Sequence, residues 1–407
     1  MSDQEAIHEE PKRPMNRRAL LGPIIGVCSL LCCLALAALG EVVARWIDLP
    51  AIASSAGVAD FDMPTWMLQE ENTASRVSRR SPNTQELEWL SLFVEGDTFR
   101  VAMHPNRELS VFDSFNRIPE RINPRFVVRT NSLGFRSDEP FPSAEVRPLR
   151  VAIFGDSSCW GWGVDQDETF SAIVRDGLRG HSQGRQVELL NFAIPGDSSE
   201  YGRLLLERFL PLYPADIVIF GFGANDAKLV GVPHREQVAR FSSTSLASRT
   251  GRWLRAHSVL YASLERIVIR QRRSASGKKP IHQRPAVPQA EFERNLVSMA
   301  RRSRELGAQR SLIVSLCSPA RYQQAAARAA RRVKGVFVNG QEALLNAVPQ
   351  LHSRTIYPTE VAAMEAEYGS SLRRDSVLYV TADGCHPNAV GHRIVAEQIL
   401  AALGAGR

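Results

Sequence analysis

Residues 150–158 read Arg-Val-Ala-Ile-Phe-Gly-Asp-Ser-Ser, and this stretch decides the fold. The run from Val151 to Phe154 is continuously apolar and ends at Gly155, which is typical of a strand that is buried on both faces. Two serines follow the glycine directly. A side chain at the carboxyl end of such a strand lies where ligands bind in open α/β sheets. The stretch therefore predicts a buried strand that presents Ser157 or Ser158 at a site.

Similar apolar runs recur along the chain and alternate with helical patterns. They predict four more strands, the last of them weak, at residues 187–192, 215–220, 311–316 and 335–338. The helices are expected at about 169–179, 200–210, 289–306, 322–333 and 390–403. Apolar strands separated by helices indicate a mostly parallel sheet with helices on both faces. We therefore expect a three-layer α/β/α domain with five strands.

Polar motifs follow two of the other strands and precede the last helix. The second strand leads into Pro195-Gly196-Asp197, and the third into Gly223-Ala224-Asn225-Asp226. Near the C-terminus the chain reads Asp383-Gly384-Cys385-His386-Pro387-Asn388. In a parallel sheet, loops that follow strands meet at one edge, so we expect these groups to lie near Ser157.

Together, these residue types suit acyl transfer through a serine. A serine hydroxyl needs a base to take its proton, and His386 can serve, with Asp383 fixing the imidazole tautomer. The oxyanion needs preorganised donors, which the backbone N–H groups of Ser157 and Gly196 and the side-chain amide of Asn225 can supply. This chemistry calls for no metal and no cofactor.

The four motifs resemble those of the SGNH hydrolase superfamily, the GDSL-like esterases and lipases, in its bacterial membrane-anchored type. The family's Ser, Gly, Asn and His fall on Ser157, Gly196, Asn225 and His386, and its Asp falls on Asp383. The likeness covers residues 149–403, and residues 129–136 resemble a segment that often precedes the domain. It implies a flavodoxin-like fold and a serine ester hydrolase. The first motif departs from the pattern, reading Gly-Asp-Ser-Ser followed by Cys159.

Neighbouring residues leave alternatives open. Ser158 is the rival nucleophile, and Asp156 is expected to be a loop or capping residue. Trp160 and Trp162 are expected to pack in the core, although either could line an acyl pocket. His392 is expected on a helix face or at a helix cap, and no metal spacing links His234, His257 and His282. For Cys159 and Cys385 we expect two separate buried thiols, with a disulfide between them as the alternative.

The N-terminus predicts a membrane anchor. Residues 19–40 carry no charge and are long enough, at about 33 Å as a helix, to cross a bilayer. Arginines and a lysine precede the run, which predicts a cytoplasmic tail and a catalytic domain on the extracytoplasmic side. Cleavage of a signal peptide after Ala38-Leu39-Gly40 is the alternative.

These patterns divide the chain into four parts. They are a cytoplasmic tail (1–18), a transmembrane anchor (19–40), a linker with a small strand-rich lobe (41–147) and the hydrolase domain (148–407), which carries an insertion at about 230–288. Residues 270–279, within this insertion, are basic and are expected to form a surface loop. The net charge of +7 is scattered and comes without a nucleic-acid-binding motif, so no nucleic-acid partner is expected.

Three functions remain open at this point. The first is hydrolysis of an ester of a lipid, a sugar or a small molecule. The second is an O-acyltransferase or deacetylase that modifies extracellular polysaccharide with the same residues. The third is a noncatalytic glycan-binding or assembly protein, which the complete set of catalytic residue types disfavours.

Overall fold

The computed structural model describes twelve stretches of the chain. They are residues 17–47, 49, 92–94, 102–112, 125–140, 147–182, 184–230, 233–241, 246–264, 267–268, 284–368 and 384–405. The chain divides into two compact units. One combines residues 1–57 with 249–277, and the other combines 58–248 with 278–407. Asp383, most of the 41–147 segment and the basic 270–279 stretch lie outside the described residues.

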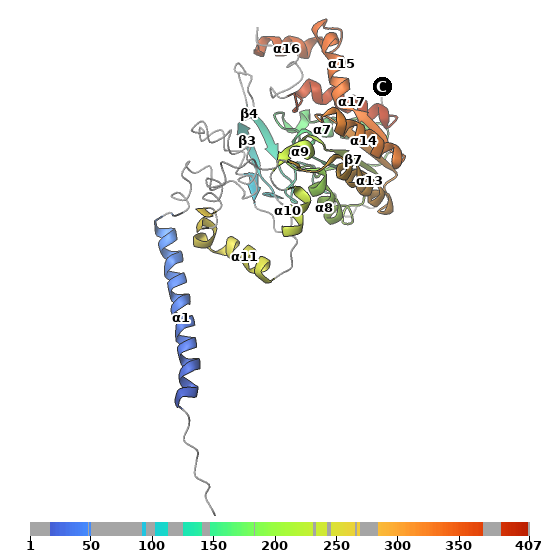
Figure 1. The fold of residues 1–407 in the computed structure, drawn as a ribbon. Helices are drawn as coiled ribbons and strands as arrows, with labels where there is room; N and C mark the ends of the chain where they lie inside the picture. The colour runs from blue at the N-terminus through green and yellow to red at the C-terminus, as the bar shows by residue number, and fades with distance from the viewer. Residues whose placement is uncertain are drawn as a thin grey trace, which may run out of the picture. The chain divides into compact units, whose positions relative to one another are not determined.

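A parallel five-stranded sheet forms the centre of the larger unit (Figure 1). Its strands are β5 (Leu149–Gly155), β6 (Val187–Asn191), β7 (Ile217–Gly221), β10 (Arg310–Ser315) and β11 (Val336–Asn339). They lie in the order β11-β10-β7-β5-β6, which in chain order is the flavodoxin-like 2-1-3-4-5 arrangement. All five predicted strands are confirmed, with ends displaced by one or two residues. Every residue of β6 and β7 is buried, as expected for strands covered on both faces.

Helices pack on both faces of the sheet. On one face α7 (Phe170–Arg179) contacts α17 (Ala389–Ala402), which in turn contacts α15 (Gly340–His352). On the other face α13 (Gln289–Glu305) contacts both α8 (Ser199–Phe209) and α14 (Ala320–Arg332). The five predicted helices are thus confirmed. The structure adds α15 and α16 (Pro358–Tyr368), which the sequence analysis did not predict.

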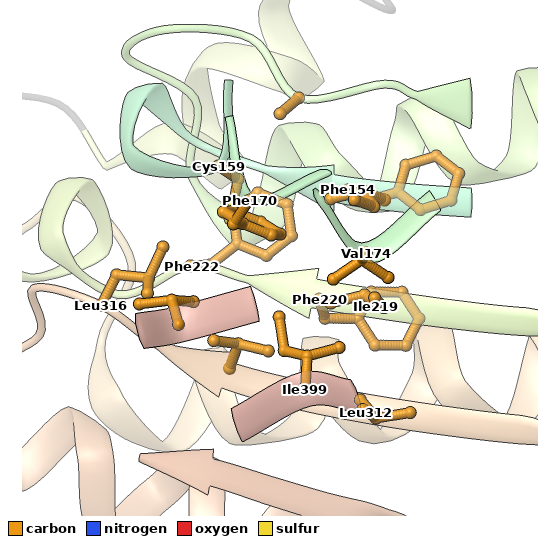
Figure 2. Close-up of a cluster of buried hydrophobic side chains, with 14 of the residues drawn as sticks. Phe154, Cys159, Phe170, Val174, Ile219, Phe220, Phe222, Leu312, Leu316 and Ile399 are labelled. Atoms are coloured by element: carbon orange, nitrogen blue, oxygen red, sulfur yellow. The ribbon is translucent and has the colours of Figure 1, made fainter. Parts of the chain in front are cut away.

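The apolar core fills the space between sheet and helices. Figure 2 shows Phe154, Phe220 and Leu312 from the strands beside Val174 of α7 and Ile399 of α17. These side chains are at most 1% exposed. Burying an aliphatic or aromatic side chain contributes about 1.5–3 kcal/mol, so this layer fixes the positions of the strand ends.

A small lobe of short strands packs onto the same core. Its strands are β1 (Phe93–Val94), β2 (Ala102–Met103), β3 (Glu108–Phe112) and β4 (Arg125–Arg129), which form two antiparallel pairs. Phe126 of β4 is buried against both Trp160 and Trp162, with ring centroids 6.3 and 5.5 Å away. The lobe therefore supports the segment that follows Ser157.

Part of the insertion also lies in the larger unit. There β8 (Leu229–Val230) pairs with β9 (Arg284–Pro285), and α10 (His234–Phe241) contacts α8. Helix α11 (Leu246–His257) starts in the larger unit and continues into the smaller one. The insertion predicted between 230 and 288 is thus bracketed by a short two-stranded sheet.

The smaller unit joins the long N-terminal helix to the rest of the insertion. Helix α1 spans Arg17–Trp46, and Ile25–Trp46 is long and apolar enough to cross a membrane, a test that a signal sequence also passes. The Glu41 carboxylate accepts hydrogen bonds from the backbone N–H groups of Val259 and Leu260 and from the Ser258 hydroxyl, at 2.8–3.1 Å. Glu41 thereby caps the helical turn that begins at Val259.

Candidate active site

Ser157 is the first residue of a short helix that starts where β5 ends. This helix, α6 (Ser157–Trp160), is capped by Asp156, whose carboxylate accepts the backbone N–H of Ser158 at 2.9 Å. Burial raises the pKa of Asp156 to about 6, although hydrogen bonds from Ser158 and Cys159 oppose the shift. Asp156 is thus the capping residue that the sequence predicted. A helix start leaves its first backbone N–H groups free of intrahelical partners, as an oxyanion site requires.

His386 lies beside Ser157. Its Nε2 atom is 2.8 Å from the Ser157 hydroxyl oxygen, although the two residues are 229 positions apart in the chain. Both side chains are half-buried. The structure therefore brings together the predicted nucleophile and the predicted base at hydrogen-bond distance.

Ser158 occupies a different environment. It is 2% exposed, and its hydroxyl donates to the backbone carbonyl of Cys385 at 3.1 Å. The Ser158 side chain therefore supports the loop that carries His386, whereas Ser157 faces the imidazole. This contrast favours Ser157 over its rival.

Gly196 lies in the loop after β6, and Asn225 lies in the short helix α9 (Ala224–Ala227) that follows β7. Gly196 has a φ of +85°, a backbone conformation that favours glycine, in a turn closed by the Asp197 N–H to Ile194 carbonyl bond of 3.1 Å. The Asn225 amide donates to the Asp197 carbonyl at 3.1 Å. One N–H of that amide thus joins the two segments.

A buried polar network supports these two loops, and the sequence analysis did not predict it. The carboxylate of Asp226, next to Asn225, accepts the Ser199 backbone N–H at 3.0 Å and the Ser199 hydroxyl at 2.5 Å. Burial raises the pKa of Asp226 to about 7. His234 of α10 lies 2.7 Å from the Ser198 hydroxyl through Nδ1. The Gly-x-Asn-Asp motif pointed to this place, but nothing in the sequence linked it to His234.

Cys385 forms a disulfide, with Cys317 as its partner. The expectation of two separate thiols is therefore wrong, and so is the alternative pairing with Cys159. Cys159 is a buried free thiol held against β5 and β7. A Cβ atom at Gly155 would lie 2.5 Å from the Cys159 Cβ, and one at Gly221 would lie 2.1 Å from its sulfur. Cys159 is thus packed against the sheet, where two glycines make room for it.

The remaining candidate residues are structural. Trp160 and Trp162 are at most 1% exposed, and the ring of Trp162 lies 6.4 Å from that of His386. His392 is fully buried and accepts the backbone N–H of Phe170 at 3.1 Å, which caps the start of α7. Burial lowers the pKa of His392 to about 3, and the charges of Arg136 and His386 act in the same direction. A neutral His392 is therefore a capping residue, as predicted.

Arg136, the last residue of the 129–136 segment, lies against the turn that follows α6. Arg136 is 1% exposed and donates to the carbonyls of Val127 and Val164 at 3.0 and 2.6 Å, and to that of Gly161. Burial lowers its pKa to about 9. Arg136 thereby ties the small lobe to the turn after α6.

Comparison with known proteins identifies the family. A model of the GDSL-like Lipase/Acylhydrolase family matches residues 153–394, more than half of the chain. An arylesterase of Vibrio mimicus is 30% identical over 84 residues, which span 21% of this chain and 40% of that relative.

Two solved structures illustrate the similarity at lower identity. TesA is 17% identical, with a TM-score of 0.35 over 62% of this chain and 97% of its own. An acetylxylan esterase from Geobacillus stearothermophilus is 16% identical, with a TM-score of 0.37 over 64% of this chain and 96% of its own. The family match covers the sheet, the serine motif and the histidine motif together. The chain belongs to the GDSL-like lipase/acylhydrolase family.

Proposed function

We propose that the protein is a serine ester hydrolase in which Ser157 is the nucleophile and His386 is the general base. The observation that carries this proposal is the 2.8 Å distance between His386 Nε2 and Ser157 Oγ. Asp383 is the third catalytic residue and orients the imidazole, since the sequence places it three residues before His386. The backbone N–H groups of Ser157 and Gly196 and the amide of Asn225 bind the oxyanion.

The reaction proceeds in two halves. The Ser157 oxygen attacks the ester carbonyl carbon while its proton passes to His386 Nε2, and the carbonyl oxygen becomes an oxyanion held by the three donors. His386 then gives the proton to the departing alcohol, which leaves an acyl-serine. Water attacks the acyl group, with His386 again taking and returning the proton, and the free acid departs.

The alternative of acyl transfer differs only in the second half. There a sugar hydroxyl replaces water as the acceptor of the acyl group. Release of free acid in the presence of a carbohydrate acceptor supports hydrolysis, whereas an acylated sugar would identify a transferase.

For the location of the enzyme, we propose a single-pass membrane anchor with the catalytic domain on the extracytoplasmic side. The supporting features are the apolar helix α1, the basic residues before it and the Cys317–Cys385 disulfide. Disulfides persist in oxidising compartments and are rare in the cytosol.

A fluorophosphonate probe tests the nucleophile directly, because it labels only an activated serine. Ser157→Ala should abolish labelling and nearly all hydrolysis of p-nitrophenyl esters, a loss of several orders of magnitude. Ser158→Ala is the matched control and should still be labelled. Normal labelling of Ser157→Ala, with labelling lost in Ser158→Ala, would reverse the assignment.

The same probe tests the base. His386→Ala should be as damaging as Ser157→Ala, because nucleophile and base act as one unit. The matched control is His257→Ala, since His257 is exposed, lies in the smaller unit and stacks on Trp253. Full activity of His386→Ala would remove it from the mechanism.

A further inference from the structure

We propose that the Cys317–Cys385 disulfide positions His386, so that the enzyme reaches its full rate only when this bond is formed. The inference rests on the function proposed above and assigns to it a dependence on redox state. Cys385 immediately precedes His386, and the bond closes a sequence separation of 68 residues. The disulfide therefore acts on the backbone at one residue from the proposed base.

One end of the disulfide is fixed to the sheet edge. Cys317 follows β10 by two residues, between Leu316 and Ser318, which are both 4% exposed. The Ser318 hydroxyl donates to the Phe222 carbonyl at 3.2 Å, in the loop after β7. Cys317 is thus part of a packed segment that contacts the loop between β7 and α9, and it offers a firm point of attachment.

The other end of the disulfide lies in the short segment 384–386, which leads into α17. Gly384, Cys385 and His386 are half-buried, and α17 begins three residues after His386. Asn388 caps that helix by accepting the Gly391 N–H at 3.0 Å. On the other side of His386, the Cys385 carbonyl accepts the Ser158 hydroxyl at 3.1 Å. The helix cap, Ser158 and the disulfide thus all act on the backbone around His386.

Among these restraints on the backbone around His386, the disulfide is the covalent one, and reduction removes it. The proton transfer requires His386 to stay within hydrogen-bond distance of Ser157, and a misplacement of about 1 Å can cost roughly a hundredfold in rate. A movement of the Cys385 backbone is transmitted directly to the adjacent imidazole. The effect should therefore fall on kcat more than on KM.

Reduction of the full-length protein in detergent micelles tests this inference. A dithiol such as dithiothreitol supplies two electrons and two protons, so that the S–S bond becomes the thiols of Cys317 and Cys385 while the reductant closes its own disulfide. The reductant is removed without air before assay, because thiols cleave activated esters. Mass spectrometry verifies the bond in each sample, and thermal melting verifies the fold.

We expect reduction to lower kcat and the rate of fluorophosphonate labelling at least tenfold, with KM changed less than about twofold and with recovery on reoxidation. The double variant Cys317→Ala/Cys385→Ala should have the kcat and the labelling rate of the reduced parent, and the dithiol should not change either value. The matched control replaces the free cysteines of α1, as Cys28→Ser/Cys32→Ser/Cys33→Ser, and should keep the parent's response.

A second measurement separates positioning from stability. Ser158→Ala removes a side-chain hydrogen bond to Cys385, so its effect on kcat should be larger in the reduced enzyme than in the oxidised one. If the reduced parent is folded and keeps its kcat and labelling rate, the inference is wrong. It is also wrong if the loss of activity on reduction is equal to the fraction of protein that has unfolded. An oxidised parent that neither hydrolyses esters nor accepts the probe overturns the proposed function instead.

Discussion

The guanidinium of Arg136 lies 4.9 Å from the ring centroid of Trp160, the last residue of the helix that starts with Ser157. At that distance the cation interacts favourably with the ring face. The same guanidinium donates to the carbonyls of Val127, in β4, and of Val164, in the segment after α6. One buried cation thus joins the small lobe to the serine-bearing segment.

Replacement of Arg136 should therefore destabilise the whole larger unit. Arg136→Met leaves several buried carbonyls without a donor, so we expect a loss of about 3 kcal/mol or more in the free energy of unfolding. Urea titration followed by circular dichroism measures it. Arg129→Ala, which removes an exposed ion pair with Glu108, should leave the midpoint near that of the parent. Equal midpoints for the two variants would contradict the role given to Arg136.

The oxyanion site predicts a kinetic effect at Asn225. Asn225→Ala removes one donor and should lower kcat roughly a hundredfold or more. It also removes the bond to the Asp197 carbonyl, so melting must be measured alongside to show that the loop stays folded. Unchanged kcat in a folded Asn225→Ala enzyme would take this side chain out of the mechanism.

Asp226 predicts a dependence of stability on pH. Burial raises its folded pKa to about 7, well above the usual value near 3.9, and the charge of Asp156 contributes. The folded protein therefore holds this proton more tightly than the unfolded chain does. Relative to an ionisation-free variant, the parent is at its most stable below about pH 4 and loses stability as the pH rises to about 7.

Asp226→Asn supplies that comparison, because it keeps an acceptor for the Ser199 groups and cannot ionise. The difference in unfolding free energy between variant and parent should shift in favour of the variant by on the order of a few kcal/mol between pH 4.5 and 7.5. Denaturant titrations at the two pH values measure it. A constant difference would show that Asp226 has an ordinary pKa.

The proposed topology predicts that the catalytic domain is reached from outside the cytoplasm. Protease added to intact spheroplasts should digest the domain while α1 stays with the membrane. Digestion only after lysis would contradict the orientation. A shortened soluble form that begins at Glu41 would instead indicate cleavage of a signal peptide.

Much of this architecture was predictable from the sequence, because it depends on the pattern of apolar residues and on the positions of the polar motifs relative to the strands. Strands such as Ile217–Gly221 are continuously apolar, and parallel strands must end at a common edge, so the meeting of the segments after β5, β6 and β7 follows from strand order. His386 does not directly follow any of these strands, and its place beside Ser157 was expected from its residue type and from the family resemblance. The disulfide was not predictable, because pairing depends on where loops meet in space. From the sequence alone, Cys159 is as plausible a disulfide partner for Cys385 as Cys317 is. The structure excludes Cys159, because its side chain packs against β5 and β7.

The supporting contacts were hidden for a related reason. Nothing local indicates that Arg136 bonds carbonyls up to 28 residues away, or that His234 of the insertion lies against Ser198. A buried cation and a surface arginine look alike in one sequence. Helices α15 and α16 were missed in a stretch where Pro349 lies inside a helix and Pro358 begins the next, which obscures the helical pattern.

The capping of Val259 and Leu260 by Glu41 links α1, the proposed anchor, noncovalently to the insertion. The covalent link runs through residues 50–91, whereas the second runs through the insertion, which rejoins the larger unit at both ends. A protease that nicks the first link would therefore not release the enzyme at once. Shedding would require a further event, the separation of α1 from the turn at Val259 and Leu260, and Glu41→Ala, which weakens that contact, should make a nicked protein leave the membrane sooner.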